Sequence, residues 1–164
     1  MCKLLQEFGA MKEKQRVMEA KLLENENKGA TKVVFSTVLG EPGTVGPFDT
    51  DTTLIYKRVI LNVGNAYNQF TGTFTAPVAG VYYFTFFYHA GGYRESKLLL
   101  YKNADVVVMT HDHHSESDTA DNGGNAVFLQ LQQGDQLFVK IEANTHVWGN
   151  DHHTTFSGFL VTET

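Results

Sequence analysis

The sequence predicts an all-β fold, a jelly-roll sandwich of about ten short strands, preceded by a short helix. From residue 33 onward, β-branched and apolar residues form short, evenly spaced runs that turn residues separate, and no helical pattern intervenes. Residues 80–88, GVYYFTFFY, alternate between two faces that are both largely aromatic, which is typical of a strand covered on both sides. This uncharged strand is expected to be core or interface, and the strand count is sufficient to close two sheets over one core.

Residues 3–28 predict the helix, because they contain no proline and are rich in Leu, Met, Lys, Glu and Ala. Leu4, Phe8, Met11, Met18 and Leu22 follow a heptad spacing, which favours a short amphipathic coiled coil over a single helix packed on its own domain. A coil of about three heptads is too short to be stable alone and would add to an oligomer held elsewhere. The pattern breaks at residues 28–31, so we expect a helical segment over 1–30 and a globular domain over 31–164.

The predicted strands follow in order along the globular domain. They lie at residues 33–39, 59–62, 72–74, 81–89, 97–102, 106–111, 125–131, 136–142 and 155–161. Turns are expected between them at residues 40–43, 91–92, 102–105, 123–124 and 133–135.

Composition excludes several classes of function. Thirteen basic and eighteen acidic residues give a formal net charge of -5, which argues against nucleic acid as a partner. No apolar run is long enough to span a membrane, and no apolar signal segment follows Met1. Cys2 is the one cysteine, so an intrachain disulfide is impossible, whereas an interchain disulfide through Cys2 is expected as an option.

A set of aromatic, Asn and Gly residues at fixed spacings resembles the complement C1q-type globular domain, which shares its jelly roll with the tumour necrosis factor family. The matching positions are Asn62, Tyr67, Phe74, Gly80, Tyr82, Phe84 and Phe86. Tyr56 stands where the family usually has Phe, and its additional hydroxyl needs a partner. Residues 134–136 and 154–160 also resemble the family, so the resemblance covers about residues 31–164.

The resemblance implies a homotrimer, and a helix with a lone Cys in place of a collagen stalk is most similar to short secreted C1q-like and cerebellin-like proteins, including those of fish. We expect a secreted, extracellular and non-enzymatic module of innate immunity, with no signal peptide in this chain. It would bind microbial surface or immune ligands through multivalent loop contacts. The alternative is a secreted signalling ligand for a cell-surface receptor, cerebellin-like or adiponectin-like.

Residues 111–121 form a loop rich in histidine and carboxylate. Calcium-binding members of the family place two Asp in this loop, and Asp112 and Asp121 correspond to them, with one extra residue between them. Crowded carboxylates repel one another, and a calcium ion would relieve that repulsion. A solvated loop without an ion is one alternative, and zinc or nickel at His111, His113 and His114 is another, since His111 and His113 project to the same side of an extended segment.

A second polar loop, residues 146–153, precedes the last strand and holds the one Trp of the chain. A large ring is costly to expose unless it packs down or meets a partner, so Trp148 either folds onto the base of the loop or binds a ligand. We assign His146, Trp148 and Asp151 as candidate ligand-binding residues. Catalysis finds little support, because Cys2 is distant in sequence from any His and neither a nucleophile elbow nor a phosphate-binding glycine motif is present.

Overall fold

The computed structural model describes residues 2–29, 31–117 and 119–164, without the side chains of residues 2–7 and 24–28. The chain forms two units, residues 1–31 and residues 32–164. No helix among the described residues is both long enough and apolar enough to cross a membrane.

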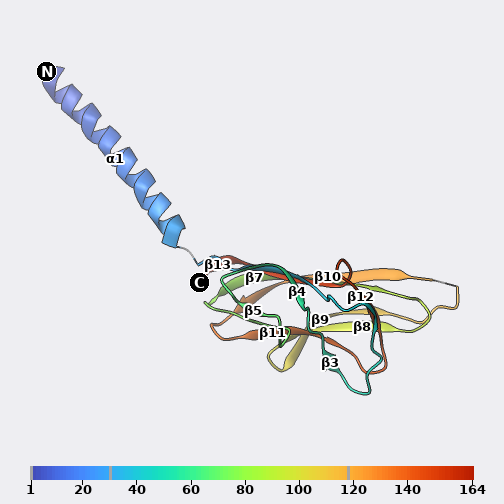
Figure 1. Ribbon diagram of the computed structural model, residues 1–164. Helices are drawn as coiled ribbons and strands as arrows, with labels where there is room; N and C mark the ends of the chain where they lie inside the picture. Colours follow the sequence, from blue (N-terminus) through green and yellow to red (C-terminus); the bar gives the residue numbers. More distant parts are fainter. Residues whose placement is uncertain (1, 30, 118) are drawn as a thin grey trace. The chain divides into compact units, whose positions relative to one another are not determined.

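The first unit is a single helix, α1 (Cys2–Gly29), as the helix-forming composition predicts (Figure 1). The described apolar side chains of the heptad seam, Phe8, Met11, Met18 and Leu22, are all more than half exposed. Gln15 Nε2 donates a hydrogen bond to Glu19 Oε1 at 3.0 Å, one helical turn further along. The trimeric coiled coil stays a prediction, and Leu4 belongs to the residues whose side chains are not described.

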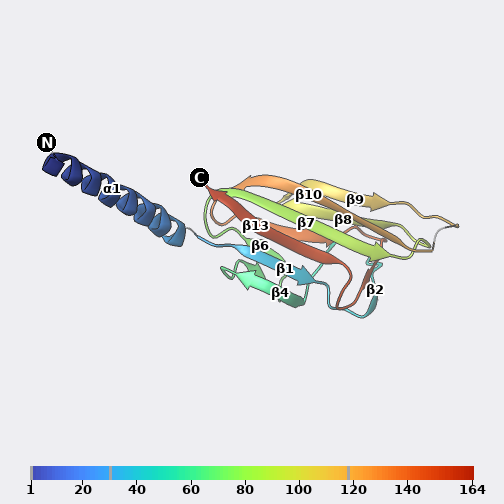
Figure 2. The same cartoon turned by 90° about the horizontal axis from the view of Figure 1, so that it is seen from above.

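The second unit is the predicted jelly-roll sandwich, with two antiparallel sheets (Figures 1 and 2). The first sheet has the order β2–β12–β7–β13–β1–β4, with β10 also paired to β7, and the second has the order β5–β6–β11–β8–β9, with β3 also paired to β11. The strands are β1 (Val34–Val38), β2 (Gly43–Val45), β3 (Thr52–Thr53), β4 (Arg58–Val63), β5 (Tyr67–Asn68), β6 (Thr73–Thr75), β7 (Gly80–Ala90), β8 (Ser96–Lys102), β9 (Asp105–Asp112), β10 (Asp121–Leu131), β11 (Gln136–Ile141), β12 (Val147–Gly149) and β13 (Thr155–Glu163).

Each predicted strand corresponds to an observed one, whereas β2, β3, β5 and β12 were not predicted. These four have only two or three residues each, so they carry no readable alternation. The turn predicted at residues 40–43 is wrong at its end, because Gly43 begins β2.

The turn predicted at Gly123 and Gly124 is also wrong, because both residues lie inside β10, opposite Tyr88 and Phe87 of β7. A Cβ atom at Gly124 would lie 2.0 Å from Phe87 Cδ1, and one at Gly123 would lie 2.5 Å from Tyr88 Cε1. The glycine pair therefore leaves room for two rings of the neighbouring strand, one on each face of the sheet.

The strand β7 organises the core, as its alternation predicts. Tyr82, Phe84, Phe86 and Tyr88 are buried, and the ring of Phe84 lies 5.1 Å from that of Phe74 and 6.2 Å from that of Phe156. The opposite face of β7 is only partly covered by the described residues, since Phe87 is 50% exposed and Tyr83 and Thr85 are half-buried. The expectation of cover on both sides is therefore confirmed for the inner face alone.

The residues that carry the family resemblance hold the loop between β4 and β5. The side-chain amide of Asn62 donates to the Tyr67 carbonyl at 2.8 Å and accepts from the Tyr67 amide at 3.3 Å. The Tyr67 hydroxyl donates to the Tyr56 carbonyl at 3.0 Å and accepts from the Tyr56 amide at 3.1 Å. The Tyr56 hydroxyl, for which a partner was expected, is buried and has none among the described residues.

Asp135, between β10 and β11, fixes another turn of the resemblance. Its carboxylate accepts hydrogen bonds from Asn103 Nδ2 at 3.0 Å and from the Gln132 amide at 2.9 Å, and it pairs with Lys102 Nζ at 3.1 Å. The hydrogen bond from Asn103 is the main reason that the pKa of Asp135 falls to about 2.

Candidate functional site

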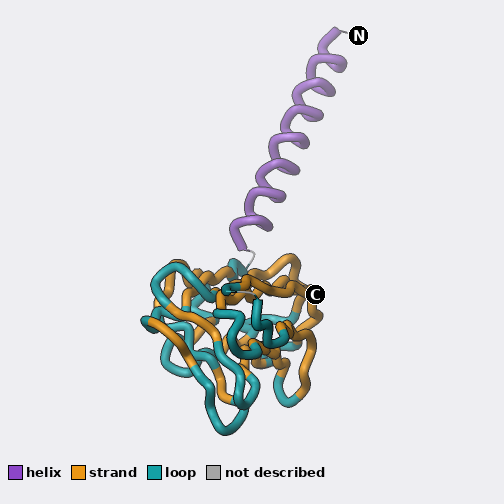
Figure 3. The backbone as a smooth tube through the Cα atoms, turned by 90° about the vertical axis from the view of Figure 1, so that its right-hand side faces the viewer, coloured by secondary structure: helices purple, strands orange, loops and turns teal. Residues whose placement is uncertain are grey.

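The polar loops predicted as binding elements meet at one end of the sandwich, which we call the loop end: residues 91–95, 113–117, 119–120 and 150–154. The strand register brings them together, because β7 ends opposite the start of β10, and β8 begins opposite the end of β9. Figure 3 looks onto this end and shows the loops gathered there. Main-chain hydrogen bonds from Ser115 to Gly92 at 3.0 Å and from His146 to Glu95 at 3.1 Å join the loops.

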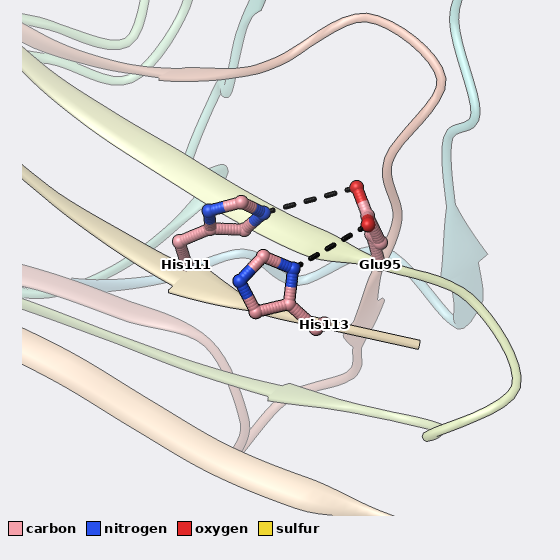
Figure 4. Close-up of side chains that lie close together, drawn as sticks. All are labelled: Glu95, His111 and His113. Carbon is pink, nitrogen blue, oxygen red and sulfur yellow. Dashed lines mark ion pairs between the residues drawn. The ribbon is translucent and has the colours of Figure 1, made fainter. Parts of the chain in front are cut away.

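At the loop end, the carboxylate of Glu95 faces the imidazoles of both His111 and His113, which lie next to each other (Figure 4). His111 Nε2 lies 3.8 Å from Glu95 Oε2, and His113 Nδ1 lies 3.5 Å from Glu95 Oε1. The structure thus brings together two of the three predicted histidines, and His114 is exposed and outside this group. Sequence reasoning missed Glu95, although the pairing of Ser96 with Asp112 places Glu95 next to His113 once the β8–β9 register is known.

Asp112 and Asp121, the predicted calcium ligands, lie at the end of β9 and the start of β10. Both carboxylates act on the same phenol, because burial, followed by the negative charges of Asp112 and then Asp121, raises the pKa of Tyr88 to about 12. Side chains alternate along a strand, so Asp112 projects to the opposite side of β9 from His111 and His113. The carboxylates and the histidines are therefore two separate sets of possible ligands.

His146, predicted as a surface contact, lies inside the fold and is 1% exposed. Its ring packs on that of Tyr93 at 4.8 Å, and neither ring nitrogen has a hydrogen-bond partner among the described residues. Burial lowers the pKa of His146; the Glu95 carbonyl acts in the opposite direction, and the charge of Arg94 lowers it further. His146 therefore supports the loop end from beneath and is not accessible to a large ligand.

Trp148 and Asp151 are both exposed, Asp151 at the loop end and Trp148 in the adjoining strand β12. Trp148 lies in β12 and not in a loop, and the residue is 42% exposed, so it is only partly folded onto the surface beneath it. Its carbonyl accepts a hydrogen bond from Thr154 Oγ1 at 2.6 Å, and the Asp151 carbonyl accepts one from Arg58. Of the three predicted contact residues, the structure leaves these two exposed, and their role in binding stays a prediction.

A groove of about 390 Å³ between β7, β10 and residues 152–155 was not predicted from the sequence. His89 lies in its wall, with Nδ1 at 3.0 Å from Asn122 Oδ1 and its ring 4.7 Å from that of His153. Phe87 and Tyr88 provide apolar lining. Its residues come from β7, β10 and the segment that leads into β13, so only the tertiary structure could reveal the groove.

A second surface, the aromatic face, lies on the outer side of the first sheet and consists of Tyr83, Phe87, Phe128 and Phe159. Figure 2 shows its strands β10, β7 and β13 side by side. The ring of Tyr83 lies 4.6 Å from that of Phe128 and 5.6 Å from that of Phe159. Phe128 is 64% exposed and Phe159 is 42% exposed.

No charge interrupts the aromatic face. Tyr83, Thr85 and Phe87 of β7 are flanked only by uncharged residues, which are Phe128, Ala126 and Gly124 on β10 and Phe159, Ser157 and Thr155 on β13. Contiguous exposed rings of this kind mark an interaction surface.

Cys2, predicted to form an interchain disulfide, is the first residue of α1. Its side chain lies outside the described residues, so the disulfide stays a prediction.

Comparisons with known proteins agree with the jelly roll and with the sequence resemblance. The family model for the C1q domain matches residues 34–161. Complement C1q and tumor necrosis factor-related protein 9 of Mus musculus is 34% identical over 116 residues, which are 68% of this chain and 34% of that protein. The match therefore spans about a third of the length of this curated relative.

Solved structures share the fold at lower identity. The globular domain of zebrafish complement 1qA protein is 22% identical, with a TM-score of 0.64 over 81% of this chain and 99% of that one. The Eiger TNF from S. frugiperda is 14% identical, with a TM-score of 0.67 over 82% of this chain and 96% of that one.

Proposed function

The chain belongs to the C1q domain family, and from this premise we propose that it is a secreted, non-enzymatic recognition module. It assembles as a homotrimer through the aromatic face and binds microbial surface or immune ligands with its loop end. The observation that carries this proposal is the uncharged aromatic face, which the single chain leaves open.

The aromatic face suits a second copy of the chain. Three rings between 42% and 64% exposed leave a large apolar area in water, and burial of apolar area stabilises an interface by about 25 cal/mol per Å². A charged or strongly polar partner would find no counter-charge on the central rows of β10, β7 and β13. An apolar surface of another subunit matches this chemistry, as expected for an obligate assembly.

Trimerisation would make the loop ends multivalent. A closed assembly with cyclic symmetry places equivalent segments at the same level along its axis, so three copies of Trp148 and Asp151 would face one ligand surface. Weak contacts of single subunits would then gain several orders of magnitude in avidity. Trimerisation of α1 as a coiled coil, and a disulfide through Cys2, would add to this assembly without being required for it.

Calcium is the cofactor proposed for this assembly, at Asp112 and Asp121. After burial, which is the main cause, the negative charges of Asp112 and then Asp121 raise the pKa of Tyr88, and two carboxylates acting on one hydroxyl fit a shared partial set of hard oxygen ligands. Calcium takes six to eight oxygen ligands, so water or a neighbouring subunit would supply the remainder.

Assembly is tested by measuring the mass of the full chain in solution over a dilution series. The expected mass is about three times the 18.3 kDa of the chain. Phe128→Arg places a charge in the aromatic face and should raise the concentration at which the trimer dissociates at least tenfold. Phe70→Arg is the matched control, because Phe70 is 80% exposed and lies outside the aromatic face.

A monomeric wild-type chain at micromolar concentration would contradict the proposal. So would equal weakening by the two variants, because any exposed ring would then have the same effect.

The ligand class is tested separately with glycan and bacterial-surface arrays, in parallel with a screen of receptor ectodomains. Trp148→Ala should reduce binding to the surface ligands without changing the mass of the trimer. Binding to a receptor ectodomain alone would favour the alternative, a secreted signalling ligand, which is consistent with the tumor necrosis factor-related name of the curated relative.

A further inference from the structure

We propose that Glu95, His111 and His113 form a binding site for a divalent transition metal, with zinc as the representative ion. This metal site is separate from the carboxylates of Asp112 and Asp121 and does not depend on the proposed function.

The spacing of the three side chains fits a tetrahedral ion. Two ligand atoms that are each about 2.0–2.1 Å from such an ion lie about 3.3–3.4 Å from each other. Glu95 Oε1 and His113 Nδ1 are separated by 3.5 Å, Glu95 Oε2 and His111 Nε2 by 3.8 Å, and one ligand atom from each residue lies within 4.8 Å of the others. The widest of these separations exceeds the tetrahedral value by at most about 1.4 Å, and rotation of the side chains about their own bonds would close that difference.

The histidine nitrogens that face Glu95 are available to a metal. In the described part of the chain, His111 Nε2 and His113 Nδ1 each face an oxygen of Glu95, at 3.8 and 3.5 Å (Figure 4). The two rings are 4.1 Å apart, and the His113 side chain is 76% exposed, so an ion can enter from solvent. Imidazole nitrogen and carboxylate oxygen are ligands that zinc prefers.

The backbone holds the site in place before any ion binds. Lys97 pairs with His111 and Ser96 with Asp112 in the β8–β9 ladder, which places Glu95 and His113 at the next position. The cation of Lys97 does not compete for Glu95, because its Nζ pairs with Glu142 Oε1 at 2.6 Å. With three ligands from the chain, the fourth position remains for water or for a group of a bound molecule.

The alternation of β9 separates this metal site from the proposed calcium site. His111 and His113 face Glu95, whereas Asp112 between them projects to the other side, where it acts on Tyr88. The two sites also differ in chemistry, since nitrogen ligands favour zinc and oxygen ligands alone favour calcium.

Titration calorimetry with zinc, on the full chain after chelator treatment and dialysis, tests the metal site. The wild type should bind one equivalent of zinc per chain at this site. The double variant His111→Ala, His113→Ala should no longer bind that equivalent. Glu95→Gln should weaken the same equivalent at least tenfold, because it removes the negative charge and keeps the shape. His114→Ala is the matched control, and it should bind zinc as the wild type does, as should Asp112→Asn with Asp121→Asn.

Zinc-edge X-ray absorption on the one-to-one complex gives a second readout, with two imidazole nitrogens and one carboxylate oxygen at about 2.0–2.1 Å. Equal zinc uptake by the wild type and the double histidine variant would overturn the proposal. An equal loss in His114→Ala would overturn it as well, because binding would then reflect histidine content and not this geometry.

Discussion

Tyr56 and Tyr67 predict opposite responses to the same substitution. The Tyr56 hydroxyl is buried without a partner among the described residues, and burial, followed by the proximity of Tyr67, raises the pKa of Tyr56 well above its ordinary value. The Tyr67 hydroxyl is also buried, but it bridges the carbonyl and the amide of Tyr56 at 3.0 and 3.1 Å. Tyr56→Phe should therefore stabilise the protein, and Tyr67→Phe should destabilise it.

The magnitudes follow from the cost of an unmade hydrogen bond. Burying a hydroxyl without a partner costs about 1–3 kcal/mol, and removal of one oxygen atom forfeits only a few dispersion contacts of about 0.1–0.2 kcal/mol each. Tyr56→Phe should thus raise the free energy of unfolding by about 1–2 kcal/mol, or the Tm by about 3–8 °C. Tyr67→Phe leaves two buried backbone groups of Tyr56 without their partner and should lower the free energy of unfolding by about 2–4 kcal/mol.

The assay is urea unfolding followed by far-UV circular dichroism, with all proteins at one concentration, since assembly makes stability depend on concentration. The slope of the unfolding free energy with urea should be the same in the three proteins, so that the midpoints are comparable. A lower midpoint for Tyr56→Phe than for the wild type would refute the reasoning, because the hydroxyl would then have a favourable partner. An unchanged midpoint for Tyr67→Phe would show that its two hydrogen bonds contribute nothing.

His146 and Asp135 predict two separate losses of stability in acid. Burial lowers the pKa of His146, so the unfolded state binds more protons than the folded state below about pH 6.5. The free energy of unfolding should therefore fall as the pH drops below this value. His146→Leu should flatten this part of the plot of unfolding free energy against pH. Hydrogen bonding, chiefly from Asn103, lowers the pKa of Asp135 to about 2. The contribution of this carboxylate to the free energy of unfolding is therefore present above about pH 4 and lost between about pH 4 and 2. Asp135→Asn should remove that loss. Urea unfolding at a series of pH values measures both losses of stability. If a variant shows the same dependence of unfolding free energy on pH as the wild type, the loss is not due to the substituted residue. Calcium should raise the Tm of the chelator-treated chain, and Asp112→Asn with Asp121→Asn should abolish that rise; a wild-type Tm insensitive to calcium would leave these carboxylates as solvated surface.

The sequence by itself determined the fold class and the main strands. The alternation of residues 80–88 places Tyr82, Phe84 and Phe86 on one face of a strand whatever lies around them, because the period of two is a property of the extended backbone. Asn62 and Tyr67 were singled out through the family resemblance alone, and the structure supplies the reason for their spacing, since the two residues hold one short loop through direct hydrogen bonds.

The tertiary structure alone decided which polar residues meet at the loop end and which of them face water. Glu95 joins His111 and His113 through the register of two strands, which depends on how β8 pairs with β9 and not on the spacing of these residues along the chain. His146 and Trp148 are two residues apart, and one is 1% exposed whereas the other is 42% exposed, because Tyr93 from a distant loop covers only the first. Gly123 and Gly124 likewise resemble a turn in sequence and belong to a strand, because the rings that require them come from β7.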